Sequence, residues 1–280
     1  MSKQTFINAV RKNIIENYVP IAVITTAVTV EMMEKSGVYW PDAHKNAEDM
    51  AVLGAMAHEL YGFENVKIPF DVAIEVEAIG LPVNFGSIDT YPQVPPSSHI
   101  IPDAFKVPEN LAESGRIPVI LDAISILKKR YPDTALVCHA MGPFSIMSML
   151  FGFGNILEWI INEDLKYPKA MEMCTCLSNK YTKLLDDAGA DIIQYGEAAA
   201  SGEVLGAHMY EDCVAPYHKN LSNHLKAPTV LHICGNITNY LKILPSLGID
   251  AISFDHKVDI KNAREIMGNS VKTVGNIDTL

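Results

Sequence analysis

The stretch AGADII, residues 188–193, ends a helical pattern with a glycine and runs at once into an apolar, β-branched segment. LGIDAI, residues 247–252, repeats the same arrangement further along the chain. In both, the glycine stands where a helix C-cap requires a left-handed residue, and a strand follows directly. Repeated junctions of this kind indicate βα units wound into one parallel sheet.

Seven short apolar runs extend this pattern over the whole chain. They are apolar at odd and even positions alike and are followed by glycine or polar residues, which is typical of parallel strands buried on both faces. The runs are 20–26, 65–71, 135–142, 191–197, 229–236, 251–256 and 271–278. Helical patterns are expected between them, near 43–60, 116–130, 156–161, 167–188, 211–225 and 237–247.

Polar residues at the carboxyl ends of successive runs favour the top face of a barrel over the single crevice of an open sheet. We therefore predict an α/β fold, a TIM (β/α)8 barrel, as one domain over residues 1–280. An N-terminal helical extension is expected at about 1–18 and a Pro-rich loop at about 81–106. Because a closed barrel has eight strands, the eighth βα unit is expected beyond Leu280.

Composition excludes several classes of partner. The formal net charge is −11 and Lys and Arg form no block, which argues against nucleic acid and against an anionic membrane surface. No apolar run reaches about 18 residues, so no membrane-spanning helix is expected, and the N-terminus lacks the pattern of a signal peptide. Five cysteines, an odd number, are typical of reduced thiols in a cytoplasmic protein.

The strongest local motif is HICGN, residues 232–236, at the end of an apolar run. Positions two apart on a strand share a face, so His232 and Cys234 can approach one zinc ion at about 2.0–2.3 Å. Gly235 then allows the backbone to turn away tightly. The spacing alone also fits a buried histidine beside a small core thiol, but its position at a strand end favours a metal site.

Three further residues at or after strand ends are candidates for catalysis. Asp71 closes an apolar run and is either a site residue or the N-cap of the next helix. Glu77, with Glu75, follows on the next segment and is either part of the site or a solvated helix start. His139 ends a third run, where it could hydrogen-bond a substrate, carry a proton, or be a satisfied, half-buried histidine.

A second group of strand-end residues is expected to line a cofactor site. Glu197 closes its run just before AAASG, residues 198–202, and these small side chains leave room for a bulky ligand. Ser201 lies in that stretch, and Asp255 and Asn276 follow the last two runs. We therefore predict Glu197, Ser201, Asp255 and Asn276 as cofactor-binding residues.

In this order, the segments resemble the uroporphyrinogen decarboxylase superfamily, and most closely its methylcobamide:coenzyme M methyltransferase branch. The segments that carry the resemblance are TVEMM (29–33), WPDAH (40–44), GFENVKIPFD (62–71), EVEAIG (75–80), GPF (142–144), HICGN (232–236) and GNID (275–278). The resemblance covers nearly the whole chain, and the order of the motifs is more specific than any one of them.

The resemblance implies a TIM barrel whose zinc is held by a His-x-Cys pair and a later cysteine. His232 and Cys234 match the pair, and the later cysteine would fall beyond Leu280. It further implies a zinc-dependent methyltransferase whose methyl donor is a corrinoid (a methylcobamide) carried by a partner protein, and whose acceptor is a thiol such as coenzyme M.

Three alternatives remain from the sequence. The acceptor could be tetrahydrofolate, whose nitrogen makes His139 or a carboxylate more important than zinc. A uroporphyrinogen decarboxylase needs no metal, but the arginine-rich signature of that branch is missing from residues 20–38. A non-catalytic corrinoid-binding protein would bind the partner without zinc. The sequence is also compatible with a homo-oligomer.

Overall fold

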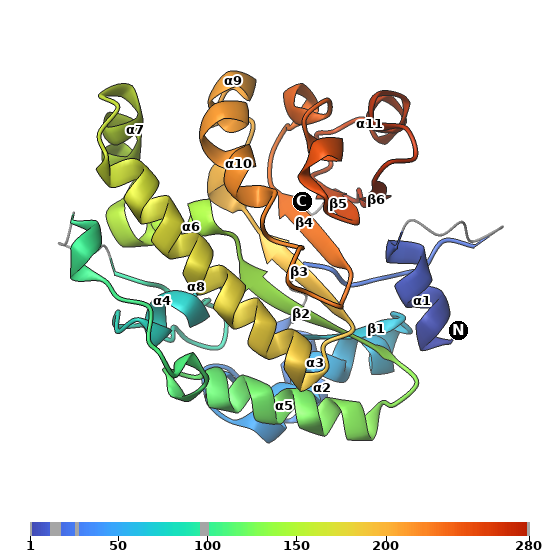
Figure 1. Cartoon of the computed structure of the whole chain (residues 1–280). Coiled ribbons are helices and arrows are strands. Elements are labelled where there is room, and N and C mark those ends of the chain that lie inside the picture. The colour runs from blue at the N-terminus through green and yellow to red at the C-terminus, as the bar shows by residue number, and fades with distance from the viewer. Residues whose placement is uncertain (1, 12–17, 26–27, 96–100, 279–280) are drawn as a thin grey trace.

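The computed structural model describes residues 2–11, 18–25, 28–95 and 101–278, and its centre is a sheet of six parallel strands (Figure 1). The strands are β1 (Asn65–Ile68), β2 (Ala135–Met141), β3 (Ile192–Gly196), β4 (Thr229–Ile233), β5 (Ala251–Phe254) and β6 (Lys272–Val274). Their order in the sheet is their order in the chain, β1 to β6. This arrangement is the wall of a (β/α) barrel and confirms the predicted fold class.

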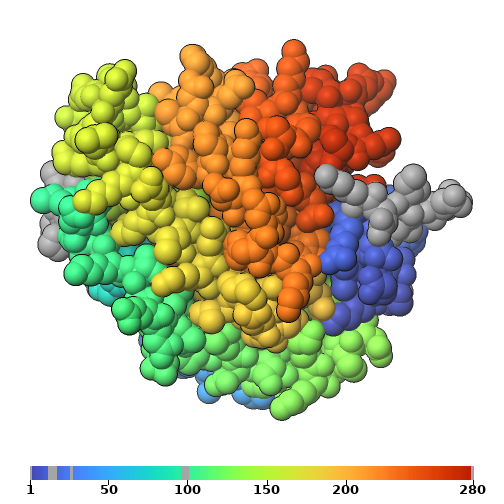
Figure 2. All heavy atoms as spheres, in the orientation of Figure 1, coloured from blue at the N-terminus to red at the C-terminus, as the bar shows by residue number. Residues whose placement is uncertain are grey.

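Helices cover the outer face of the sheet, and Figure 2 shows α8, in yellow, running between the green α5 and the orange segment above it. The α-helices that lead into the strands are α3 (Ala47–Tyr61) before β1, α5 (Ile117–Arg130) before β2, α8 (Lys166–Ala188) before β3, α10 (Ala215–His218) before β4 and α11 (Ile260–Met267) before β6. The remaining α-helices of the described chain are α1 (Lys3–Val10), α2 (Val30–Ser36), α4 (Ile74–Ala78), α6 (Pro143–Phe151), α7 (Phe153–Ile161) and α9 (Ala207–Met209). In α5, buried side chains recur every three or four residues, which is the spacing of one helix face.

The predicted strand at 20–26 is wrong for residues 20–25, and Thr26 lies outside the described residues. This segment runs beside β1 but pairs with it largely through a side chain. The Asn65 amide accepts from the Val23 N–H and donates to the Val23 carbonyl, both at 2.8 Å. Because the amide supplies these bonds, no strand ladder forms there.

Two predicted helices are shorter than expected. The helix expected at 211–225 ends at His218, after a π-helical turn at Tyr210–Val214. Its end follows from two buried contacts: His218 turns inward, and the Leu221 carbonyl accepts from the Tyr195 hydroxyl at 2.7 Å. The helix expected at 237–247 consists of two 3-10 turns, Thr238–Tyr240 and Leu244–Leu247, because Pro245 has no N–H to continue the first.

Helix α1 closes the amino end of the barrel. The predicted N-terminal extension contains this helix, which Ser2 caps by accepting from the Thr5 N–H at 3.2 Å; residues 12–17 are outside the described chain. Phe6 and Val10 pack inside the barrel on apolar residues near the starts of β2 to β5, namely Ala135, Val137, Ile192, Val230 and Ala251. The barrel therefore has an apolar floor at this end.

The Pro-rich loop contains little regular structure where it is described. It has isolated bridges at Asn84–Gln93 and Ser87–Thr90 and a 3-10 turn at Pro102–Ala104, while residues 96–100 are not described. The Tyr91 ring lies 4.9 Å from the Trp40 ring, measured between centroids.

No single helix in the described ranges is both long and apolar enough to cross a membrane. Only α6 and α7 taken together meet that length and composition, and they meet at a bend of 106°.

Candidate active site

The barrel interior contains a polar layer above its apolar floor. Side chains alternate along a strand, so residues two positions after the floor residues face the same interior. They are His139 on β2, Gln194 on β3, His232 on β4 and Ser253 on β5. The fifth member is Lys67 of β1, which is buried and whose charge lowers the pKa of both histidines. Four of the five side chains form two pairs, with His139 Nδ1 2.7 Å from Gln194 Oε1 and His232 Nδ1 3.0 Å from Ser253 Oγ.

The predicted metal pair lies at the upper edge of this layer. His232 Nε2 is 3.3 Å from Cys234 Sγ. Two ligands of one tetrahedral zinc stand roughly 3.5 Å apart, given zinc–nitrogen and zinc–sulfur bonds of about 2.0 and 2.3 Å. Since Ser253 holds Nδ1, the other ring nitrogen is the one directed at the cysteine. The two donor atoms therefore fit a shared zinc ion.

Burial affects both members of the pair in the absence of a metal. It lowers the pKa of His232, which keeps the ring neutral with a lone pair available, and it raises the pKa of the Cys234 thiol. A metal ion reverses the second effect, because a coordinating thiol loses its proton. Within the described ranges, no group of three or more His, Cys, Asp or Glu residues is placed to hold a metal.

Three of the four predicted cofactor-binding residues surround the turn that follows Cys234. Gly235 has a φ of 74°, and a Cβ on it would collide with Ser201 Oγ. Its N–H donates to Asp255 Oδ2 at 2.9 Å. Asn276 donates to the carbonyls of Asp255 and Val258 at 3.2 and 2.5 Å, so its amide holds the segment after β5. Their role in cofactor binding stays a prediction.

Asp255 remains ionised beside the pair. Burial raises its pKa, but the N–H groups of Gly235 and Lys257, together with the positive charges of His256 and Lys257, leave the pKa below its usual value. Its other oxygen lies 3.0 Å from His256 Nδ1. A carboxylate thus stands next to the two candidate ligands.

Two of the predicted catalytic residues, Asp71 and Glu77, lie in a separate buried ion-pair cluster. Arg116 donates to both oxygens of Asp71 at 2.9 and 3.0 Å and to Glu77 at 2.5 Å. His44 Nδ1 lies 3.1 Å from Asp71, whose carboxylate also accepts from the Ala73 N–H at 3.0 Å. Although burial opposes ionisation, His44 and Arg116 hold the pKa of Asp71 well below its usual range.

This arrangement makes Asp71 a fully engaged carboxylate. The expected N-cap role is wrong, because the N-cap of α4 is Ala73 and no side chain caps that helix. The part of Asp71 in the reaction stays a prediction. Neighbouring Glu75 is different: burial raises its pKa to about 8, and its Oε1 accepts from the Met141 N–H at 2.7 Å.

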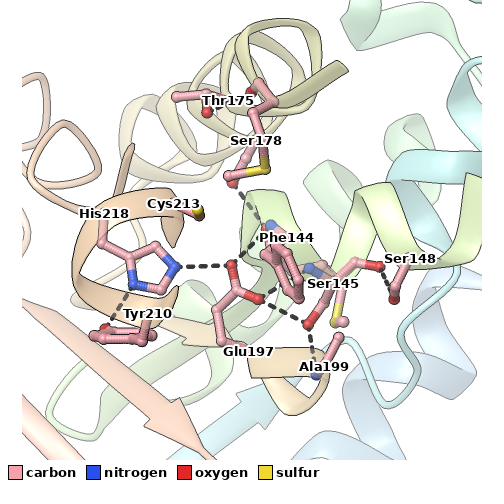
Figure 3. Close-up of polar contacts among 12 residues, drawn as sticks. Phe144, Ser145, Ser148, Thr175, Ser178, Glu197, Ala199, Tyr210, Cys213 and His218 are labelled. Carbon is pink, nitrogen blue, oxygen red and sulfur yellow. Dashed lines mark hydrogen bonds and ion pairs between the residues drawn. The ribbon is translucent and has the colours of Figure 1, made fainter. Parts of the chain in front are cut away.

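Glu197 is the centre of a third buried network, shown in Figure 3. Its oxygens accept from the Phe144 and Ser145 N–H groups at the start of α6, at 3.0 and 2.9 Å, and from the Ser145 hydroxyl at 2.8 Å. His218 Nε2 lies 3.0 Å from the same carboxylate, and its Nδ1 is 3.0 Å from the Tyr210 hydroxyl. A Cβ on Gly142 would collide with Glu197, so only glycine fits there.

Both carboxylate oxygens of Glu197 accept hydrogen bonds from groups of the chain itself. The side chain is completely buried, and its predicted role in cofactor binding stays a prediction. The small residues after it form a 3-10 turn at Ala198–Ala200 that leads to Ser201 beside Gly235.

Sequence reasoning missed Lys67, His44, Arg116, His218 and Tyr210. One sequence feature could have predicted a partner such as Arg116 or His44: Asp71 lies in an apolar run, and a buried carboxylate needs a cationic partner. Nothing local identifies which one, because Arg116 is 45 residues from Asp71.

Comparison with known proteins places this site in a family. All 280 residues match the family model described as uroporphyrinogen decarboxylase (URO-D). The chain belongs to the uroporphyrinogen decarboxylase family. This URO-D chain is 37% identical over 284 residues to the methylcobamide:CoM methyltransferase MtbA of Methanosarcina mazei, covering 99% of the chain and 82% of that protein.

A solved structure points to the same branch. The structure of a methyltransferase from Methanosarcina mazei matches this URO-D chain with a TM-score of 0.93 at 30% identity, covering 99% of the chain and 83% of the other. A uroporphyrinogen decarboxylase of Thermodesulfovibrio yellowstonii is less similar, at 27% identity over 99% of the chain and 82% of that protein. These matches confirm the resemblance drawn from the motifs and the prediction that the chain is an enzyme of the methyltransferase branch.

Proposed function

We propose that this chain transfers a methyl group from a methylated corrinoid protein to a thiol, coenzyme M, with zinc held by His232 and Cys234. The observation that carries the proposal is the 3.3 Å approach of His232 Nε2 to Cys234 Sγ at a barrel strand end. The relatives named methylcobamide:CoM methyltransferases support the donor and the acceptor.

The residues around the pair have separable tasks. Ser253 fixes the orientation of His232 through Nδ1, so that Nε2 is directed to the metal position. The Gly235 turn, held by Asp255, brings Cys234 back toward His232. His232 and Cys234 would hold the zinc, which would supply a lowered pKa to a coordinated thiol and so a thiolate at neutral pH. Transfer of the methyl group to that sulfur breaks the cobalt–carbon bond, and its electron pair stays on the corrinoid as cob(I)amide.

Partial exposure of the pair fits a reaction between a small acceptor and a protein-borne donor. His232 and Cys234 are both half-buried, whereas Asp71, Glu75 and Glu197 are fully buried. A methyl group carried by a second protein has to approach from outside, at the end of the barrel where strands β4 and β5 terminate.

The test combines metal content with acceptor choice. His232→Ala and Cys234→Ala should each lower the zinc bound per chain and the rate of methyl transfer from methylcobalamin to coenzyme M, while circular dichroism stays unchanged. Cys213→Ala, a partly buried cysteine outside the pair, is the matched control and should retain both properties.

Acceptor specificity separates the alternatives in the same experiment. Transfer to tetrahydrofolate but not to thiols, decarboxylation of a porphyrinogen without metal, or binding of the corrinoid protein with no turnover would each contradict the proposal. Full zinc occupancy in both alanine variants would contradict the assigned ligands.

A further inference from the structure

Two polar atoms inside the barrel have no partner. Among the described residues, Lys67 Nζ and His139 Nε2 are buried side-chain atoms without a hydrogen bond. Both side chains belong to the polar layer that also contains His232. Buried polar groups in folded proteins are nearly always hydrogen-bonded, and an unpaired buried charge is the costliest exception.

The charge of Lys67 is not neutralised by its surroundings. Burial lowers the pKa of Lys67 to about 8, against smaller opposing effects of Cys138 and Asp71, so the ammonium is still largely protonated at neutral pH. Asp71 offers no free capacity, because its carboxylate already binds Arg116 and His44. Lys67 is therefore a buried cation that lacks an anion.

His139 adds a second polar group to the same space. Burial and the positive Lys67 lower the pKa of His139 to about 3, so the ring is neutral. Its Nδ1 pairs with the Gln194 side-chain amide. Because Gln194 Oε1 faces Nδ1 and can only accept, the ring proton lies on Nδ1 and Nε2 carries a lone pair.

The floor of the barrel fixes the direction from which a ligand arrives. Below the polar layer lie Val137, Ile192 and Val230, with Phe6 and Val10 of α1 packed against them. An anion cannot enter through this apolar plug. His232 belongs to the same interior layer and lies close enough to Lys67 for the ammonium charge to lower its pKa.

We propose that Lys67 binds the oxyanion at the far end of the thiol acceptor, while the thiol lies at His232 and Cys234. This inference rests on the proposed function. Coenzyme M, 2-mercaptoethanesulfonate, has the required chemistry, with a thiol at one end and a sulfonate at the other. Lys67 thereby selects acceptors that carry a negative charge.

Direct binding tests the subsite without turnover. Calorimetry on the full-length, metal-free chain compares ethanesulfonate, propionate and the neutral ethyl methyl sulfone. Lys67→Met should weaken ethanesulfonate binding by roughly 10- to 100-fold, the range for a lost charged hydrogen bond. The affinity for the sulfone should stay unchanged. Tighter binding of ethanesulfonate than of propionate would identify a sulfonate acceptor, and the reverse a carboxylate acceptor.

Lys128→Met is the matched control. Lys128 is already paired, since it donates to the Gly189 carbonyl at 2.7 Å and lies 3.6 Å from Asp191. Its loss should leave the binding of ethanesulfonate unchanged. Equal affinity of wild type and Lys67→Met for ethanesulfonate, or no preference for the sulfonate over the sulfone, would overturn the subsite.

Thermal stability separates a binding role from a structural one. Without ligand, Lys67→Met replaces an unpaired buried cation with an apolar side chain of similar length, so Tm should rise by roughly 3 °C or more. A lower Tm together with unchanged ethanesulfonate affinity would make Lys67 a structural residue and overturn the proposal.

Turnover distinguishes the subsite from the proposed function. In Lys67→Met the ratio of kcat/KM for coenzyme M to kcat/KM for uncharged 2-mercaptoethanol should fall roughly 10- to 100-fold, mainly through KM. An unchanged ratio in an active enzyme would count against the subsite. A wild type that methylates neither thiol would refute the proposed function, and the calorimetric comparison would still decide whether Lys67 binds an oxyanion.

Discussion

Polar residues at the carboxyl ends of the strands fall into two kinds of region. Around Asp71 and Glu197, every carboxylate oxygen faces donors of the chain itself and both side chains are completely buried. Around the Gly235 turn, His232 and Cys234 are half-buried and face each other, with one ring nitrogen and one sulfur left for an outside partner.

The difference distinguishes side chains that stabilise the fold from side chains that are able to bind a ligand. A buried carboxylate with all its hydrogen bonds made stabilises the barrel rim and has no capacity for a ligand. Donor atoms that converge without satisfying each other are suited to bind something else. Position at a strand end alone did not distinguish the two, whereas the completeness of hydrogen bonding does.

The largest expected contrast is between two aspartates. Asp71→Asn removes the charge that faces the buried Arg116 and should lower the free energy of unfolding by about 3–5 kcal/mol. Asp255→Asn, at a side chain that is 24% exposed, should change it by at most about 1 kcal/mol. Urea unfolding of both variants measures the difference, and equal losses would remove the distinction between the two regions.

A smaller effect is expected for the pH dependence set by Glu75. Its pKa is raised by burial to about 8 in the folded chain, against an ordinary value of 4.5 for a glutamate in water. Between these values the folded state holds a proton that the unfolded state has lost, so stability falls as pH rises. The contribution is about 1.4 kcal/mol per pH unit, or about 2.7 kcal/mol between pH 5 and pH 7.

Glu75→Gln should remove that part of the slope, because the amide does not titrate. Unfolding free energies measured from pH 5 to pH 7 test this, with Glu34→Gln as the exposed control. A slope that persists unchanged in Glu75→Gln would mean that Glu75 is ionised in the folded protein.

The smallest expected effect concerns the support of the metal pair. Ser253→Ala removes the hydrogen bond to His232 Nδ1 and should weaken zinc binding by roughly 10- to 100-fold, with stability nearly unchanged. Competition with a zinc chelator measures the affinity. Ser246→Ala, at an exposed serine that bonds only a local carbonyl, should bind zinc like the wild type; a wild-type affinity in Ser253→Ala would show that His232 needs no such support.

Local patterns predicted most of the fold. Six of the seven apolar runs contain the six strands, because burial on both faces leaves a continuous apolar signature. The run at 20–26 has the same signature, but its partner on β1 is the Asn65 side chain, which no period reveals. The helix at 211–225 ended early because the His218 side chain is drawn to Glu197, 21 residues away.

The site residues also divide into those that local sequence predicts and those that only packing brings together. His232 and Cys234 were predictable because their geometry follows from two positions on one strand. The partners of Asp71 were not, since His44, Asp71 and Arg116 meet only when three separate segments pack together. Lys67 reads as one charged residue in a strand, and its lack of a partner exists only in three dimensions.

The plug formed by α1 has a kinetic consequence. With Phe6 and Val10 sealing the amino end, the barrel works as a well rather than a tunnel. Under the proposed function, the thiol has to enter before the corrinoid protein covers the mouth, and the thioether can leave only after that protein departs. Steady-state rates should therefore follow an ordered mechanism, with excess corrinoid protein inhibiting turnover at low thiol concentration.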